Sequence, residues 1–354
     1  MFLLQAMPNV TDTPENAAYR RFFYSRWGKE NCVVSARART AVYPPFTQRL
    51  SIKCAWGGAE RYHIDGRTLA VDDDNYLVLN DGRHYASALT GTRPIHSFSI
   101  FFRPRMAEET LGGMLTAADQ LLERGTDPAR RSVEFAEYLR PHDKTVTPAL
   151  RFIAHYADRS LGDELWYEEQ LSFLLERMLQ AHRTSVAQMD SLRAVRRSTR
   201  REMFKRIAWS TDFIHTYFDR PLTIDQLAES AHLSKYHFIR LFRLVHGVTP
   251  HQYLQRKRGA VAQRLLETTD LGHHEITARV GFDHRSTMFR QLVRMTGRSG
   301  RTLRERSADR GASVFFGCAR TLHSGHKPGV MIDSNAELDL RKSRRPLRFG
   351  QFVP

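Results

Sequence analysis

One pattern of hydrophobic and polar positions occurs twice between residues 222 and 297. The first copy, residues 222–247, reads LTIDQLAESAHLSKYHFIRLFRLVHG, and the second, residues 271–297, reads LGHHEITARVGFDHRSTMFRQLVRMTG. In each copy apolar residues recur every three or four positions, stop at a short turn, and then recur again. The pattern predicts two pairs of short helices, each helix with one buried face.

The second helix of the first copy has distinct buried and outer faces. Ser234 is suited to cap its start, and Gly247, followed three residues later by Pro250, is suited to end it. The inward positions fall at i, i+3, i+4 and i+7, and they are Phe238, Leu241, Phe242 and Val245. The outward positions are mostly basic or polar, and they are Lys235, Tyr236, His237, Ile239, Arg240 and Arg243.

The second copy divides in the same way. Its turn is predicted at Gly281 and Phe282, and its second helix is predicted to be capped by Asp283. The inward positions of that helix are Met288, Leu292 and Met295. The outward positions are Arg285, Ser286, Thr287, Arg290 and Arg294.

Two short helices joined by a tight turn, with a basic outer face on the second, are typical of proteins that read the major groove of DNA. The alternative is a pair of ordinary helical hairpins with solvated basic faces. Two copies with matched apolar positions argue against that alternative. Residues 251–268 are predicted to form one helix between the copies, about 27 Å long at roughly 1.5 Å per residue. Because adjacent major-groove faces lie about 34 Å apart, this helix suits two reading heads in adjacent grooves.

Residues 204–306 resemble the DNA-binding domain of the AraC/XylS family of bacterial transcription regulators. The stretches that carry the resemblance are PLTIDQLAESAHLSKYHFIRLFR, GVTPHQYL, RLLETTDL and EITARVGFDHRSTMFRQL. The resemblance implies double-stranded DNA as a partner, and RNA polymerase as a further partner if the protein is an activator. It also implies that eight residues face DNA: Lys235, Tyr236, His237 and Arg240, with Arg285, Ser286, Thr287 and Arg290. Lys257 and Arg258 of the connecting helix are expected to touch phosphate.

From about residue 31 to residue 103 the hydrophobic period is that of a strand. Between residues 50 and 56, Leu50, Ile52, Cys54 and Trp56 alternate with Ser51, Lys53 and Ala55. Short strands separated by turns such as Asp65-Gly66 are typical of a β-barrel or sandwich. Residues 31–105 resemble the cupin-like β-barrel sensor found in front of many AraC-type DNA-binding domains. The predicted fold class is α+β multidomain, a cupin-like sensor with trailing helices followed by an all-α double helix-turn-helix domain.

Four polar side chains of this segment are candidates for binding a small-molecule effector, and they are Tyr62, Tyr76, Tyr85 and His96. Each has an alternative as a core residue, with His96 bonded to a backbone carbonyl. Metal-dependent cupins converge several ligands on one ion, whereas His63, His84 and His96 each stand alone in the sequence. The sequence therefore predicts no metal site, no catalytic residue and no cofactor, and the protein is not expected to be an enzyme.

The remaining segments complete the predicted organisation. Residues 1–30 form an N-terminal arm, residues 183–203 a linker, and residues 307–354 a basic, disordered tail. Residues 106–182 are predicted to be helical. Their apolar stripe either packs on the barrel of the same chain or forms a homodimer seam, and it consists of Leu171, Leu174, Leu175, Met178 and Leu179.

The charge of the chain favours a polyanionic partner. The net charge is +16, and residues 201–306 contain 19 Lys and Arg against 10 Asp and Glu. The three cysteines, Cys32, Cys54 and Cys318, have neither disulfide nor zinc spacing. No signal peptide or stretch of about 20 apolar residues is present, so a cytoplasmic protein without a membrane partner is expected.

The predicted function is a sequence-specific DNA-binding transcription regulator that senses a small molecule through its N-terminal domain. One alternative is a cupin-type or nucleic-acid enzyme with a DNA-binding appendage. Another is an architectural DNA binder without a ligand.

Overall fold

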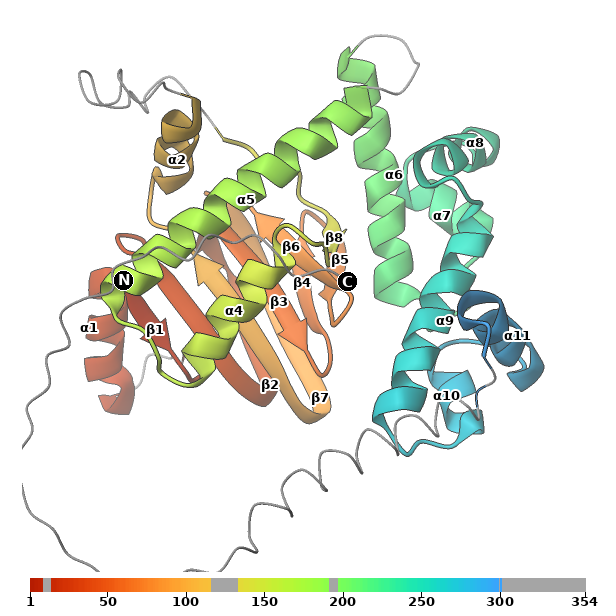
Figure 1. Cartoon of the computed structure of the whole chain (residues 1–354), viewed down its shortest axis with the longest axis horizontal. Coiled ribbons are helices and arrows are strands. Elements are labelled where there is room, and N and C mark those ends of the chain that lie inside the picture. Colours follow the sequence, from red (N-terminus) through yellow and green to blue (C-terminus); the bar gives the residue numbers. More distant parts are fainter. Residues whose placement is uncertain (9–13, 116–132, 191–196, 299, 301–354) are drawn as a thin grey trace, which may run out of the picture. The chain divides into compact units, whose positions relative to one another are not determined.

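The computed structural model describes residues 1–8, 14–115, 133–190, 197–298 and 300 of the 354-residue chain (Figure 1). Residues 1–304 form one compact unit. The second unit, residues 305–354, includes the predicted basic tail and lies outside the described residues.

Eight strands of residues 1–141 form one sheet. The main pairing path runs β1-β2-β7-β3-β6-β8, and β4 pairs with both β5 and β7. The strands are β1 (Phe2–Leu4), β2 (Cys32–Gln48), β3 (Ser51–Trp56), β4 (Glu60–Ile64), β5 (Arg67–Val71), β6 (Asn75–Leu79), β7 (Arg83–Phe101) and β8 (Leu139–Pro141). Within the described ranges this path does not close on itself, so the structure shows a sheet-rich domain and the cupin-like barrel stays a prediction.

The two longest strands, β2 and β7, pair with each other along most of their length, and β7 also pairs with β4 and with β3. β7 pairs with β4 through residues 86–89 and with β3 through residues 96–101. The pairing of β2 with β7 shifts register twice, between Ala38 and Thr40 and between Tyr43 and Phe46. Such irregularities bend a strand.

The predicted hairpin between β4 and β5 is confirmed. Asp65 and Gly66 form a two-residue turn with φ angles of 49° and 73°. Two positive φ values suit the right-handed twist of the paired strands, and Asp and Gly tolerate them.

One face of the sheet is covered by helices. α4 (Thr147–Asp158) and α5 (Glu164–Asp190) lie across it, and α2 (Met106–Leu115) packs against α5 (Figure 1). The core beneath them contains the strand residues Ile52, Phe98 and Ile100. The apolar stripe of α5 is buried in this core of the same chain, and it consists of Leu171, Leu174, Leu175, Met178 and Leu179.

The N-terminal arm contains regular structure. β1 adds to the sheet parallel to β2, and a short 3₁₀ turn (Pro14–Asn16) leads into α1 (Ala17–Arg26). Phe23 of α1 and Trp27 just after it stack with ring centroids 4.8 Å apart, and Trp27 meets Phe101 of β7 at 4.6 Å. α1 therefore packs on the sheet near β2 and β7.

The predicted linker range, 183–203, contains helix at both ends. α5 continues to Asp190, and α6 (Arg197–Tyr217) begins seven residues later. Residues 191–196 lie outside the described residues.

In the part of the chain that the structure describes, five further helices follow α6. They are α7 (Ile224–Ser230), α8 (Lys235–His246), α9 (Pro250–Thr268), α10 (His273–Arg279) and α11 (Arg285–Thr296). They build two separate cores, one around Phe238 and Phe242 of α8 and one around Met288 and Leu292 of α11. The predicted duplicated helix pairs and the single connecting helix are confirmed.

Local capping explains where these helices begin and end. Thr223 and Thr249 each form a reciprocal capping box, with Gln226 and Gln252. Gly247 ends α8 with a φ of 69°, as predicted. The prediction that Asp283 caps the last helix was wrong by one residue. His284 has the extended conformation of an N-cap, and Asp283 belongs to the turn.

Candidate nucleic-acid interface and buried cavity

The outer face of α8 presents polar side chains to solvent. Lys235 and Arg240 are exposed, and Tyr236 is 88% exposed. The Lys235 ammonium forms an exposed ion pair with Asp225 of α7 at 3.1 Å. His237 is half-buried. The buried face is occupied by Phe238, so the backbone of α8 is anchored while Tyr236 and Arg240 are exposed to solvent.

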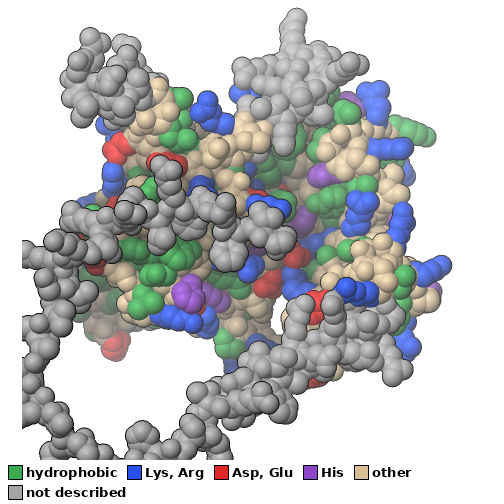
Figure 2. Space-filling model, viewed as in Figure 1, with side chains coloured by type: hydrophobic (Ala, Val, Ile, Leu, Met, Phe, Trp, Pro, Cys, Tyr) green, Lys and Arg blue, Asp and Glu red, His purple; other side chains and the backbone are tan. Residues whose placement is uncertain are grey.

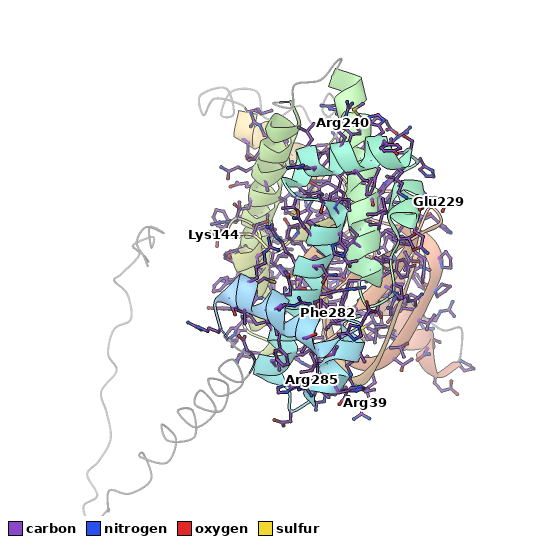
Figure 3. All side chains as sticks on the ribbon, turned by 90° about the vertical axis from the view of Figure 1, so that its right-hand side faces the viewer. Arg39, Lys144, Glu229, Arg240, Phe282 and Arg285 are labelled. Carbon is purple, nitrogen blue, oxygen red and sulfur yellow. The ribbon has the colours of Figure 1, made fainter. Side chains whose placement is uncertain are left out.

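The outer face of α11 has the same arrangement. Arg285, Ser286 and Arg290 are exposed, and Thr287 is half-buried. The guanidinium of Arg290 donates to Thr287 Oγ1 at 3.4 Å. Figure 3 shows Arg240 on α8 and Arg285 at the start of α11, on two separate helices. The structure thus provides two outward faces, each carrying arginine.

Both turns within the helix pairs use a left-handed residue at the same position. His232 has a φ of 51° and Gly281 a φ of 77°. A Cβ on Gly281 would lie 2.6 Å from the carbonyl oxygen of Asp219, which ends the α6 region. Only glycine fits there, because any other side chain would meet backbone as well as adopt an unfavourable φ.

α9 connects the two helix pairs, and two of its cationic side chains contact other parts of the chain. Lys257 and Arg258 are each 6% exposed. Lys257 pairs with Asp72 at 3.1 Å and with Asp74 at 2.6 Å, in the turn between β5 and β6. Arg258 donates to the carbonyl oxygens of Phe218 and Arg220, both at 2.7 Å. Neither cation is exposed to a phosphate in this arrangement, contrary to the expectation from sequence.

Lysine and arginine side chains are numerous on the surface over α8 and α11 (Figure 2). The exposed cations of these two helices are Lys235, Arg240, Arg243, Arg285, Arg290 and Arg294. A surface of this kind attracts the phosphate backbone of nucleic acid at long range.

A cavity of about 520 Å³ lies on the side of the sheet opposite α4 and α5. Its wall is formed by the arm, by α1 with Trp27, and by strands β2, β3, β4 and β7. Tyr62 and Tyr85 line it with ring centroids 5.8 Å apart. Lys53 and Glu60 are the charged groups of the lining. This volume is in the range that accommodates small organic ligands.

A family model described as a helix-turn-helix domain matches residues 227–306. The regulatory protein SoxS of Escherichia coli strain K12 is 31% identical over 100 residues, which are 28% of this chain and 90% of SoxS. The chain belongs to the AraC/XylS family of helix-turn-helix transcription regulators.

Two further matches cover very different shares of the protein compared. The regulator AlkR of Acinetobacter baylyi is 31% identical over 94 residues, which are 27% of this chain and 31% of AlkR. The chain therefore spans about a third of AlkR. The DNA-binding domain of AdpA, solved in complex with a target DNA, is 30% identical and has a TM-score of 0.29, covering 30% of this chain and 95% of that one.

In this AraC/XylS-type chain the four candidate effector residues lie on opposite faces of the sheet. Tyr62 and Tyr85 line the cavity, whereas Tyr76 and His96 face the helices. The Tyr76 hydroxyl donates to Asp143 at 2.8 Å. His96 Nε2 lies 2.8 Å from Ser35 Oγ and 3.2 Å from Asp158. Burial lowers the pKa of His96, although the Asp158 carboxylate opposes that shift.

The charged lining residues were not among the candidates from sequence. Lys53 is 2% exposed and Glu60 is 4% exposed. Period-two alternation placed Lys53 on the strand face opposite Ile52 and Cys54, which is ordinarily the solvent face of a half-buried strand. The cover over that face comes from α1 and β2, and the alternation within β3 contains no information on either.

The structure adds three observations on other candidate chemistry. Among the described residues, no group of three or more His, Cys, Asp or Glu side chains is arranged to hold a metal ion. Cys32 and Cys54 are free and buried, and Cys318 lies outside the described residues. No helix of the described ranges is long and apolar enough to cross a membrane.

Proposed function

We propose that this protein is a sequence-specific DNA-binding transcription regulator whose α8 and α11 read adjacent major grooves. The observation that carries the proposal is that each helix buries one face in its own core and exposes arginine on the other. The eight DNA-facing residues are Lys235, Tyr236, His237, Arg240, Arg285, Ser286, Thr287 and Arg290. Arginine can donate two hydrogen bonds to guanine, which supplies sequence discrimination.

The connecting helix supports a two-groove geometry. α9 contains 19 residues and is about 28 Å long at roughly 1.5 Å per residue. Its ends are fixed by the Thr249 capping box and by packing against α11, so α8 and α11 are held by a rigid spacer.

The N-terminal sheet has the proposed role of sensing a small molecule in the cavity lined by Tyr62 and Tyr85. The protein is proposed to regulate rather than to catalyse, with no cofactor. Support comes from a cavity that is lined by aromatic side chains and has no lining residue from α8 or α11. We also propose that the protein forms a homodimer and, if it is an activator, contacts RNA polymerase.

Fluorescence anisotropy with labelled duplex DNA tests the DNA-binding proposal. The full chain should bind duplexes with an affinity that falls steeply between about 50 and 200 mM salt, because phosphate contacts release counterions. Replacing Arg240 and Arg290 together with alanine should weaken binding, while Lys144→Ala, an exposed cation before α4, should not. The absence of salt-sensitive binding to any duplex in a selected pool would refute the proposal.

A further inference from the structure

The cavity contains a buried lysine without an anionic partner. Lys53 is 2% exposed, and its ammonium lies 3.5 Å from the centroid of the Phe101 ring and 5.5 Å from that of Tyr85. Among the described residues it donates no hydrogen bond and forms no ion pair within 4.0 Å. An aromatic face stabilises a cation only in part, so the charge of Lys53 remains largely uncompensated.

Glu60, the acidic residue of the same cavity, is hydrogen-bonded to a residue other than Lys53. Glu60 accepts a hydrogen bond from Ser97 Oγ at 2.7 Å and is not within ion-pair distance of Lys53. Gln48 also lines the cavity, is 7% exposed, and its Oε1 has no hydrogen-bond partner among the described residues. Buried polar groups are ordinarily paired, so Lys53 and Gln48 indicate a missing polar ligand group.

Apart from Thr47 and three serines of β7, the rest of the cavity wall is apolar or aromatic. Phe23 and Trp27 from the α1 region, Tyr43 and Phe46 from β2, and Phe101 from β7 contribute rings to it. Rings of this number favour a flat apolar body over a sugar or a peptide.

We propose that the cavity binds a small organic anion, with an apolar ring system against the aromatic wall and one negatively charged head group on Lys53 Nζ. This inference rests on the proposed sensing role of the sheet and names the chemical class of its ligand. A charged hydrogen bond between the head group and Lys53 gives the ammonium the partner that the protein does not supply.

The protonation of Lys53 makes this binding dependent on pH. Burial lowers the pKa of Lys53 to about 7, although Glu60 on β4 and Cys32 on β2 oppose that shift. Tyr85 on β7 also faces it. An anion bound to the ammonium favours the protonated form, so binding takes up a proton near neutral pH. The affinity for an anion should therefore decline as the pH rises above about 7, and the affinity for a neutral analogue should not.

A matched pair of fluorescent probes tests the proposal on the full chain. 8-Anilinonaphthalene-1-sulfonate is an aromatic anion, and N-phenyl-1-naphthylamine is the same ring system without the sulfonate. The anion should bind at one site per chain and at least about tenfold more tightly at pH 6.5 than at pH 9. The neutral probe should change less than about twofold over that range.

Variants assign the effect to Lys53. Lys53→Met should weaken binding of the anion about tenfold or more and leave the neutral probe within about twofold. Lys53→Arg should retain the anion, and Lys144→Met, which removes an exposed lysine, should change neither probe. If Lys53→Met fails to fold, the pH dependence of the two probes on the unchanged chain still tests whether Lys53 binds the anion.

Two results would overturn the proposal: equal affinity of the two probes at pH 6.5, or loss of both probes to the same extent in folded Lys53→Met. Anisotropy with labelled duplex separates this outcome from the sensing role. If the anion binds in a Lys53-dependent manner but leaves the affinity for DNA unchanged, the anion site is confirmed and the sensing role is refuted. Absence of the anion site would leave DNA binding through α8 and α11 untouched.

Discussion

Lys257 Nζ lies 2.6 Å from Asp74 Oδ2, and this ion pair joins α9 to the turn between β5 and β6. Arg264 of α9 also pairs with Asp74. A second contact joins α6 to β5, where Thr216 Oγ1 accepts from the backbone of Ala70 and donates to that of Thr68. The connecting helix that spaces α8 and α11 is thus attached to the turn between β5 and β6 by two carboxylates, Asp72 and Asp74, of which Asp74 has two cationic partners.

Removing that carboxylate should destabilise the protein. Asp74→Asn leaves the buried Lys257 with Asp72 as its remaining acidic partner, and the free energy of unfolding should fall by about 1–3 kcal/mol. Urea unfolding at pH 7 measures this loss. Asp225→Asn, which breaks the exposed pair with Lys235, is the matched control and should cost less than about 1 kcal/mol.

The Asp74 effect also has a predictable pH dependence. Burial raises the pKa of Asp74, but Lys257 and Arg264 outweigh burial and hold it below its usual value. A carboxylate with a lowered folded pKa stabilises the protein above its unfolded pKa of about 3.9, and that contribution disappears as the pH falls further. An Asp74→Asn variant whose deficit were the same at pH 7 and at pH 3 would contradict this account.

Arg240 and Arg290 should each determine part of the preferred DNA sequence. Alanine at either position removes a side chain able to bond guanine twice, a pairing worth about 1–3 kcal/mol in discrimination. Selection of binding sites from random duplexes should show relaxed preference at one or two base pairs for each variant. The two affected positions should lie about one helical turn apart. An unchanged preferred sequence in both variants would exclude readout by two helices.

Gly281→Ala should destabilise the second helix pair. The new Cβ meets the Asp219 carbonyl at 2.6 Å and must also adopt a φ of 77°, so we expect a loss of about 2 kcal/mol or more. Gly297→Ala separates the two causes, because Gly297 has a φ of 67° and no atom within 4 Å of the added Cβ. It should cost about 1 kcal/mol. Urea unfolding of both variants measures the difference, and equal losses would show that the Asp219 contact relaxes freely.

Lys53→Met should stabilise the ligand-free protein below about pH 10. The pKa of Lys53 is about 7 in the folded chain and about 10.4 when unfolded, so protonation favours unfolding throughout that interval. The advantage of the variant should grow as the pH falls from 10 to 7, reach a few kcal/mol, and then stay constant. Unfolding free energies at pH 7, 8, 9 and 10 give the test. A difference independent of pH would mean that Lys53 titrates normally.

The sequence by itself determined the helices from α7 to α11, because their signals are local. A period near 3.6, Ser234 at the N-cap position of α8, and Gly247 at a left-handed position depend on neighbours a few residues away. The strand alternation around Ile52 was equally local, and it grouped His96 with Phe98 and Ile100 on one face, where the structure has them.

Only the tertiary structure decided what covers each face. Alternation states which residues share a side of a strand, but it contains no information on whether α1 or α5 lies over that side. The alternation placed Lys53 on the face opposite Ile52, and only the packing of α1 and β2 shows that this face is enclosed. β8 and the contact of Lys257 with Asp74, 183 residues apart, were missed for the same reason. Such pairings are set by the packing of segments remote in sequence, and no local pattern encodes them.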